Sequence, residues 1–258
     1  MIRRFLERAI PNQSDGYRRL VVRAYAAVAP LILGPALHHL VKGLFAAVMG
    51  RRERRIEHFL DGAVLWGERV QRFTRTRVHQ FGTVECPPAG HLILLNHVNE
   101  LDFAFDCLVL RKPYLANETI KRTLFAYWWM RGMGSQVFDQ RQSRTIARSV
   151  HALLAALPLR SYIVYPEGGN SYGETIRPLR KGMLKLAFEH RIPVFVVLKS
   201  GLASFQEQQR DNVVGYLPLG TIEPEGFSDW MAFRTHIHER MCAEKPGLDA
   251  RVRALRAG

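Results

Sequence analysis

The chain has 258 residues, of which 47% are hydrophobic and 23% charged, as is ordinary for one large globular domain, with or without a smaller appendage. This composition excludes intrinsic disorder, fibrous repeats and a transporter with many membrane spans. The exception is the charge: 37 Lys and Arg against 23 Asp and Glu give +14. Such an excess predicts an anionic partner, whether nucleic acid, an anionic membrane or a phosphorylated substrate.

Half of the net charge lies in residues 1–60, where eleven basic residues stand against four acidic ones. Within this region, residues 24–50 are apolar apart from two histidines and one lysine. A spanning helix needs about 20 apolar residues, and Pro30 and Pro35 would break its hydrogen-bond ladder. We therefore expect two shorter helices joined near Gly34 that dip into one leaflet, with a true span or a buried soluble helix pair as alternatives.

Basic residues flank this apolar segment on both sides. That arrangement suits the cytoplasmic face of a membrane, where each Lys or Arg near the surface contributes about 1 kcal/mol. From residue 51 to about 77, apolar residues recur at steps of three to four and predict an amphipathic helix, which either packs on the next domain or lies on lipid. We assign residues 1–80 to an N-terminal helical membrane-anchoring or interfacial region.

After about residue 81, short apolar runs alternate with helical stretches. Strands are expected at residues 91–96, 112–116, 135–138, 161–165, 193–199 and 213–217. Helices are expected from about residue 101, at 118–131, 144–156 and 179–190, and at 227–242 as a closing helix. Runs rich in β-branched and aromatic residues that alternate with helices indicate βαβ units. Residues 81–258 are therefore predicted to form an α/β domain with a largely parallel sheet flanked by helices.

Neither the cysteines nor the histidines predict a metal site. Cys86, Cys107 and Cys242 are odd in number, widely spaced and form no CxxC pair, so a disulfide framework is not expected either. His236 and His238 stand two apart on a predicted helix and would point to different faces.

A polar segment, residues 96–102 (NHVNELD), follows the first predicted strand of this domain. In α/β sheets, reactive groups collect beyond the carboxyl ends of strands. His97 and Asp102 can meet across the strand-to-helix turn, so that the carboxylate orients the imidazole and leaves its other nitrogen as a base. An aspartate that only caps the helix is the alternative. GxSxG is absent, which favours direct activation of a substrate hydroxyl over a covalent enzyme intermediate.

A second polar strand end comes at residues 165–171 (YPEGGNS). Glu167 is followed by two glycines and two small polar residues, which predicts a tight turn that an oxygen-rich ligand can approach closely. A turn without a function is the alternative. Two such strand ends in one sheet are less easily explained as coincidence.

These residues resemble the PlsC-type glycerolipid acyltransferases, typified by 1-acylglycerol-3-phosphate acyltransferase. Residues 96–102 resemble the family's NHxxxxD block, and residues 165–168 (YPEG) its FPEG block. Three further blocks are similar, in family order: residues 137–141 (VFDQR) to IFIxR, 179–182 (LRKG) to FKKG and 192–196 (IPVFV) to VPIVPV. The blocks cover roughly residues 85–225, and their order makes the resemblance specific.

The resemblance implies that His97 deprotonates a hydroxyl of a lyso-glycerolipid while Asp102 orients it. The acyl donor would be acyl-CoA or acyl carrier protein, and the expected product with 1-acylglycerol-3-phosphate is phosphatidic acid. Six residues would bind substrate, with Arg141 on the acceptor phosphate: Asn96, Arg141, Glu167, Gly168, Gly169 and Lys181. The implied partners are membrane lipids, the lyso-lipid and the donor, with no nucleic acid and no cofactor, on the cytoplasmic face of a membrane.

Four positions depart from the family pattern. Gly169 and Asn170 stand where Thr and Arg are common, Asn117 stands where Lys is common, and Asn99 replaces a frequent Ser. Two cations are thus absent from the expected phosphate site, which leaves the acceptor headgroup open: another lyso-lipid acceptor, or transfer from a phospholipid donor, is the alternative. A non-enzymatic basic protein that binds membranes or nucleic acid is the alternative from another class.

Overall fold

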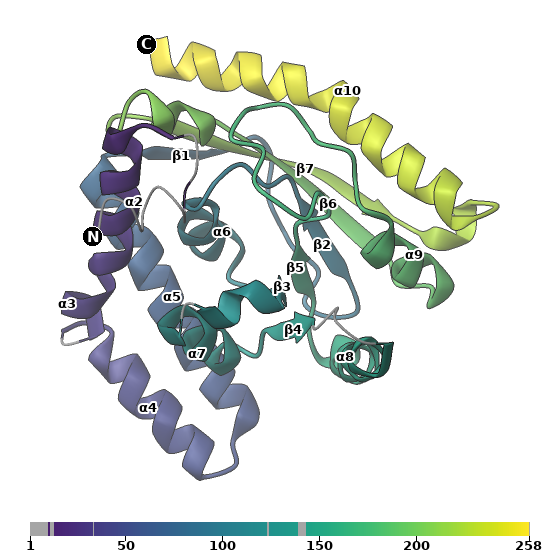
Figure 1. The fold of residues 1–258 in the computed structure, drawn as a ribbon, viewed down its shortest axis with the longest axis horizontal. Helices are drawn as coiled ribbons and strands as arrows, with labels where there is room; N and C mark the ends of the chain where they lie inside the picture. Colours follow the sequence, from purple (N-terminus) through teal and green to yellow (C-terminus); the bar gives the residue numbers. More distant parts are fainter. Residues whose placement is uncertain (1–9, 11–12, 33, 123, 139–142, 258) are drawn as a thin grey trace.

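A computed structural model of the chain describes residues 10, 13–32, 34–122, 124–138 and 143–257 (Figure 1). Five strands form the main sheet in the order β1-β7-β6-β2-β5, and every neighbouring pair is parallel except β6 and β7. Two further parallel strands, β3 and β4, join β5 through a bridge between Tyr114 and Ile163. The expected α/β fold with a largely parallel sheet is confirmed.

The strands are β1 (Arg77–Gln80), β2 (Leu92–Leu95), β3 (Leu115–Asn117), β4 (Gln136–Phe138), β5 (Tyr162–Val164), β6 (Val194–Ser200) and β7 (Val213–Ile222). The α-helices are α2 (Asp15–Ala26), α3 (Val28–Ile32), α4 (Leu37–Val48), α5 (Arg52–Thr74), α6 (Asp102–Leu110), α7 (Leu124–Gly132), α8 (Ser143–Ala156), α9 (Lys181–Glu189) and α10 (Trp230–Ala257). Short 3₁₀ turns are η1 (Glu118–Arg122), η2 (Leu157–Leu159), η3 (Ala203–Gln206) and η4 (Pro224–Gly226).

Helices cover both faces of the sheet, and the alternation of strand β2 shows why its sequence is apolar throughout. All four residues of β2 are buried. Ile93 and Leu95 belong to a core shared with α5 and α6, whereas Leu92 and Leu94 belong to a second core shared with α9 and α10. Because successive side chains point to opposite faces, a strand covered on both sides has no polar position (Figure 1).

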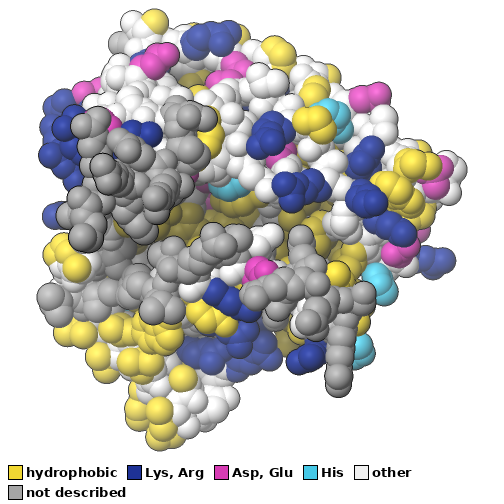
Figure 2. Space-filling model, viewed as in Figure 1, with side chains coloured by type: hydrophobic (Ala, Val, Ile, Leu, Met, Phe, Trp, Pro, Cys, Tyr) yellow, Lys and Arg dark blue, Asp and Glu magenta, His cyan; other side chains and the backbone are white. Residues whose placement is uncertain are grey.

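The apolar N-terminal segment forms separate helices. Helix α3 ends at Ile32 and α4 begins at Leu37, so the break expected near Gly34 is present. The outer face of α4 is apolar and exposed, and Figure 2 shows hydrophobic side chains gathered at the lower left, where Figure 1 places α4. Its exposed large residues are Leu37, Val41, Leu44, Phe45 and Val48.

Among the described residues, no helix combines the length and the apolar character needed to cross a membrane.

The N-terminal helices share their buried residues with the sheet. Tyr17, Leu20 and Trp66 lie in the same core as Ile93 and Leu95. Strand β1, which ends at Gln80, pairs with β7 and is the first strand of the main sheet along the chain. The main sheet therefore includes residues from the region assigned to 1–80. The division of the chain at residue 80 stays a prediction.

Strand β7 and helix α10 extend beyond their predicted lengths, and strand β1 was not expected. The helix expected to about residue 77 ends at Thr74, and the left-handed backbone of Arg75 (φ 51°) then turns the chain into β1. Strand β7 continues to Ile222. Pro246 lies within helix α10 and removes one helical hydrogen bond. The helix continues beyond it because Leu248 and Val252 are buried against the sheet and stabilise the last turns.

Candidate active site

Three neighbouring strands bring the polar residues together. The segment with His97 follows β2, the segment with Glu167 follows β5, and Lys199 lies near the end of β6. Because β2 runs parallel to both β5 and β6, their carboxyl ends meet at one edge of the sheet, where ligand sites in such folds lie. The two strand ends singled out by sequence are therefore adjacent.

His97 and Asp102 form the expected dyad. His97 Nδ1 lies 2.6 Å from Asp102 Oδ2. An ionised carboxylate only accepts hydrogen bonds, so Nδ1 carries the proton and Nε2 is left as the basic nitrogen. The His97 side chain is 21% exposed, whereas Asp102 is 1% exposed. The imidazole therefore faces the solvent side of the pair, where a substrate can reach it.

Asp102 also receives two further positive or polar groups. The Val98 main-chain N–H donates to Asp102 Oδ2 at 2.7 Å, and Lys199 Nζ lies 3.1 Å from the same oxygen. Asp102 Oδ1 is buried and has no hydrogen-bond partner in the described part of the chain. The carboxylate is thus fixed through one oxygen.

A second buried carboxylate lies beneath the dyad. Lys199 Nζ donates to Asp106 Oδ2 at 2.7 Å, and Lys199 and Asp106 are both fully buried. Tyr165 and Tyr216 donate their hydroxyl protons to the two oxygens of Asp106, at 2.5 Å and 2.8 Å. The Tyr165 ring also stacks on the His97 imidazole, with centroids 4.1 Å apart and planes at 10°. Tyr165 therefore joins the buried network to the His97 ring.

The two carboxyl groups differ in pKa. Burial alone would raise the pKa of Asp102, but the Lys199 charge and the hydrogen bond from His97 outweigh it and hold that pKa below its usual range. Burial raises the pKa of Asp106, and the nearby Asp102 charge adds to the effect, although Lys199 opposes both. Asp102 is accordingly the member that stays ionised beside His97.

Glu167 ties the two motif segments together. Its Oε1 accepts from the His97 main-chain N–H at 2.7 Å, and its Oε2 accepts from that of Arg177 at 2.7 Å. Burial raises the pKa of this carboxyl group. Gly168 has φ +69°, and a Cβ there would lie 2.3 Å from Arg180 Nε. Glycine is thus required both by the backbone and by the packing of Arg180.

Glu100 connects the first motif to helix α2. Tyr17, on α2, donates to Glu100 Oε2 at 2.7 Å, and Tyr25 donates to the Glu100 carbonyl at 3.0 Å. From the second motif segment, Asn170 Nδ2 donates to Glu100 Oε1 at 2.8 Å, and Tyr172 donates to the same oxygen. Helix α2 is therefore fixed directly to the first motif segment and, through Glu100, to the second.

Residues 48–199, more than half of the chain, match the protein family described as Acyltransferase. The chain belongs to the acyltransferase family. Its fold is similar to the crystal structure of the 1-acyl-sn-glycerophosphate (LPA) acyltransferase PlsC from Thermotoga maritima, with a TM-score of 0.67 and 18% identity over 88% of this chain and 96% of that one. No curated protein sequence matches significantly. The resemblance to the PlsC type is confirmed at the level of family and fold.

The remaining predicted site residues of the acyltransferase lie as follows. Asn96 is buried and braces the sheet: its Nδ2 donates to the Lys199 carbonyl at 3.0 Å, and its Oδ1 accepts from the Lys199 N–H at 2.8 Å. Gly169 follows Gly168 in the turn, and Lys181 is exposed at the first turn of α9. Arg141 lies outside the described residues. Substrate contacts by these four residues stay predictions.

The cysteines of the acyltransferase are poor nucleophiles, because a thiolate is the reactive form. Burial raises the pKa of Cys86 to about 11 and raises the pKa of Cys107 still further above its usual range. Burial therefore disfavours a covalent intermediate on the sulfur of Cys86 or Cys107.

Sequence reasoning missed Lys199, Asp106 and Glu100. A signal for the first two was present, since Lys199 ends an apolar strand and Asp106 interrupts an apolar helix four residues after Asp102. Charges in such runs are rarely buried without a partner. Only the tertiary structure shows that they are partners of each other.

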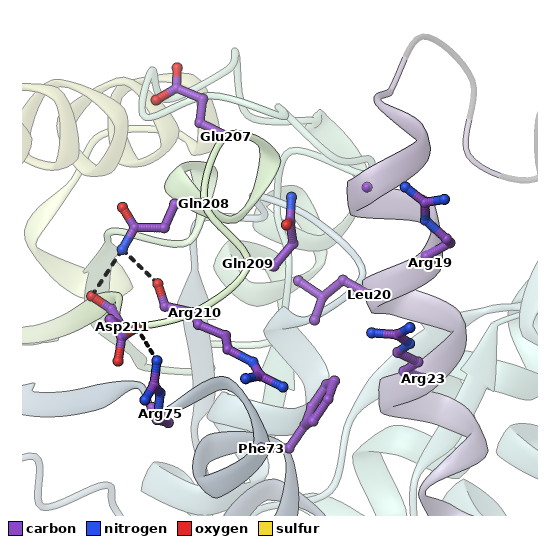
Figure 3. Close-up of a pocket in the computed structure, with 11 residues that line it drawn as sticks. Arg19, Leu20, Arg23, Phe73, Arg75, Glu207, Gln208, Gln209, Arg210 and Asp211 are labelled. Atoms are coloured by element: carbon purple, nitrogen blue, oxygen red, sulfur yellow. Dashed lines mark hydrogen bonds and ion pairs between the residues drawn. The ribbon is translucent and has the colours of Figure 1, made fainter.

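A separate pocket of about 830 Å³ lies between α2, the end of α5 and residues 207–211 (Figure 3). Arg23 and Arg210 extend toward one another above Phe73, and the Arg210 guanidinium carbon lies 5.9 Å from the Phe73 ring centroid. Asp211 is paired with Arg75 at 2.8 Å, and Glu207 points away. The pocket gives this side of the acyltransferase a strongly basic surface.

Proposed function

We propose that this acyltransferase moves a fatty acyl group from an acyl thioester to a hydroxyl of a lyso-glycerolipid, with His97 as general base. Acyl-CoA or acyl carrier protein is the donor, and 1-acylglycerol-3-phosphate is the first acceptor to test. The observation that carries the proposal is the dyad: Asp102 holds Nδ1–H of His97 in a family of acyl-transfer enzymes. The protein of similar fold from Thermotoga maritima is named for the same class of acceptor.

The proposed reaction needs one proton carrier. His97 Nε2 takes the proton of the acceptor hydroxyl as its oxygen attacks the thioester carbonyl, and the resulting imidazolium is stabilised by the Asp102 carboxylate. The C–S bond then breaks, and the imidazolium returns the proton to the departing thiolate. The products are the ester and the free thiol, and His97 is regenerated. General base catalysis of this kind contributes about 10²- to 10⁴-fold.

The acceptor headgroup is proposed to meet the basic residues after the second motif. Arg177 Nη1 donates to the Asn170 carbonyl at 2.9 Å, and the exposed Arg180 packs against Gly168. Guanidinium groups suit phosphate oxygens. The Asn170 side chain is uncharged and donates to Glu100, so it cannot replace the arginine that is common at this position. A lyso-lipid with another headgroup is therefore the alternative acceptor, whether the acyl group comes from a thioester or, in a transacylase reaction, from a phospholipid.

Membrane attachment is proposed to use α4. Its exposed apolar residues lie beside a group of arginines at the start of α5, where burial and the charges of Arg52, Arg131 and Arg160 lower the pKa of Arg55. Apolar side chains next to basic ones are typical of helices that lie in the interface of an anionic membrane. This supports attachment at the cytoplasmic face.

The test is a donor and acceptor panel on the purified protein. Acyl-CoA, acyl carrier protein and a phospholipid are each offered with lyso-lipids that carry phosphate, phosphocholine or phosphoethanolamine, and products are read by mass spectrometry. We expect thiol release that depends on a lyso-lipid. No acyl transfer to any lyso-lipid, from any donor, would overturn the proposal.

The His97→Ala variant tests the mechanism. We expect turnover to fall about 10²- to 10⁴-fold, with unchanged circular dichroism. His151→Ala is the matched control, because His151 is exposed on α8. Full turnover by His97→Ala would exclude His97 as the base.

A further inference from the structure

Two histidines and an aspartate meet where α4 packs against α5. His39 lies on α4, and His58 and Asp61 lie one turn apart on α5. One ligand atom from each lies within 4.8 Å of the other two, and His39 Nδ1 is 3.7 Å from Asp61 Oδ2. Ligand atoms at about 2.0–2.1 Å from one tetrahedral Zn²⁺ are roughly 3.4 Å apart. Small side-chain rotations therefore bring this set around a single ion.

Each of the two imidazoles has a ring nitrogen without a hydrogen-bond partner among the described residues. Nδ1 of His39 and Nδ1 of His58 are both buried and have no hydrogen-bond partner in the part of the chain that the structure describes. Buried polar atoms normally have a partner, and a metal ion would satisfy both.

Arg111 holds Asp61 from the other side. Its Nε and Nη2 donate to Asp61 Oδ1 at 2.9 Å and 2.6 Å, and Nη2 also donates to Glu57 Oε2 at 2.6 Å. The carboxylate is thus oriented through one oxygen, and its Oδ2 is directed at His39. Partners of this kind orient metal ligands. Glu57 and Asp61 offset the Arg111 charge.

We propose that His39, His58 and Asp61 bind a divalent transition-metal ion such as Zn²⁺, with water completing the coordination. The ion joins α4 to α5. Such a link would stabilise the packing of α4, because its described buried residues are only the small Gly43 and Ala46, and its opposite face is apolar and exposed. This differs from the expectation of no metal site, which rested on the cysteine spacing and on His236 and His238. The proposed ligands lie on two different helices, so no spacing within one helix predicts them.

The experiment is a Zn²⁺ titration of the full chain, purified without a histidine tag and freed of metal. We expect one ion per chain by calorimetry. His39→Ala, His58→Ala and Asp61→Asn should each weaken binding by at least about tenfold, the lower end of the effect of removing a supporting partner. Equal affinity in the wild type and these variants would overturn the proposal.

A competing pair sets the control. Cys242 Sγ lies 3.8 Å from either ring nitrogen of His238 on α10, and a thiol next to an imidazole also binds Zn²⁺. Cys242→Ser should leave the affinity unchanged. Loss of binding in Cys242→Ser alone would assign the ion to α10 and overturn the proposal.

A second readout guards against misfolded variants. Zn²⁺ should slow tryptic cleavage at Lys42, which lies within α4, and at Arg51, which follows it, in the wild type and in Cys242→Ser. Without metal, all variants should be cleaved at the same rate as the wild type. Cobalt substitution should give a spectrum without a thiolate-to-metal band, and a strong thiolate band would contradict the proposed ligands.

Discussion

Lys199 is the residue on which the ionisation of the dyad depends most directly. It is fully buried and contacts Asp102 and Asp106, 3.1 Å and 2.7 Å from its Nζ. Two buried carboxyl groups share one ammonium, and the Lys199 charge lowers the pKa of Asp102 more than the hydrogen bond from His97 does.

Lys199→Met is expected to destabilise the fold, because it leaves buried carboxyl groups without a counterion. Breaking a buried ion pair in this way costs about 3–5 kcal/mol, measured by denaturant unfolding. Lys199→Met combined with Asp106→Asn should recover much of that loss, since the second change removes the unpaired charge. A double variant no more stable than the single one would contradict this account.

The same variant carries a pH prediction. The pKa of Asp102 is lowered in the folded protein, so the stability it contributes is present above its unfolded pKa and is lost as pH falls through the lower folded value. Without Lys199 the folded pKa rises. Activity and stability of Lys199→Met should therefore fall at a higher pH on the acidic side than those of the wild type. Acidic limbs that coincide would show that Lys199 does not control Asp102.

At the scale of elements, α4 packs on α5 with one face and exposes an apolar face on the other side. Phe45 is 58% exposed and Val48 82% exposed. Fully burying a side chain of this size contributes about 1.5–3 kcal/mol, and lipid is the partner that the proposed reaction requires. Helix α2, which precedes this segment in the chain, contacts the motif that holds the dyad, because Tyr17 donates a hydrogen bond to Glu100.

Replacing Phe45 and Val48 by Ser should weaken binding to phospholipid vesicles by about 1.5–3 kcal/mol for each residue, following the burial figures above. Co-sedimentation with vesicles measures it. Leu159→Ser is the matched control, because Leu159 is 59% exposed and lies elsewhere in the fold, in η2. If the control loses as much binding as the α4 variant, α4 is not the contact.

At the scale of the whole molecule, the net charge of +14 is spread over several surfaces, and these need not have one role. The start of α5 carries arginines beside the apolar face of α4. The pocket of Figure 3 carries Arg19 and Arg23 on α2. The proposed membrane contact distinguishes the two groups.

Arg51→Gln with Arg54→Gln should weaken binding to anionic vesicles by about 1 kcal/mol per charge. Arg19→Gln with Arg23→Gln makes the same change in net charge and should have little effect. The difference between the pairs should shrink as salt is raised, because the screening length is about 8 Å at physiological ionic strength. Equal losses from the two pairs would mean that total charge, rather than the surface beside α4, controls binding.

Much of the fold followed from local pattern. Apolar runs such as residues 92–95 gave strands, and the prolines and glycine near residue 34 gave a break between helices. Both depend on side chains close in sequence. Strand β1 and the last turns of α10 did not follow, because they depend on pairing with β7 and on burial against the sheet.

The sequence by itself determined the motif pair and the expectation of a His97–Asp102 dyad, because both residues lie within six positions and the strand-to-helix turn brings them together. Only the tertiary structure decided what surrounds them. Lys199 lies 93 residues from Asp106, and Tyr17 lies 83 residues from Glu100. Such contacts depend on which strands are neighbours in the sheet and on where α2 packs, and no local spacing encodes either.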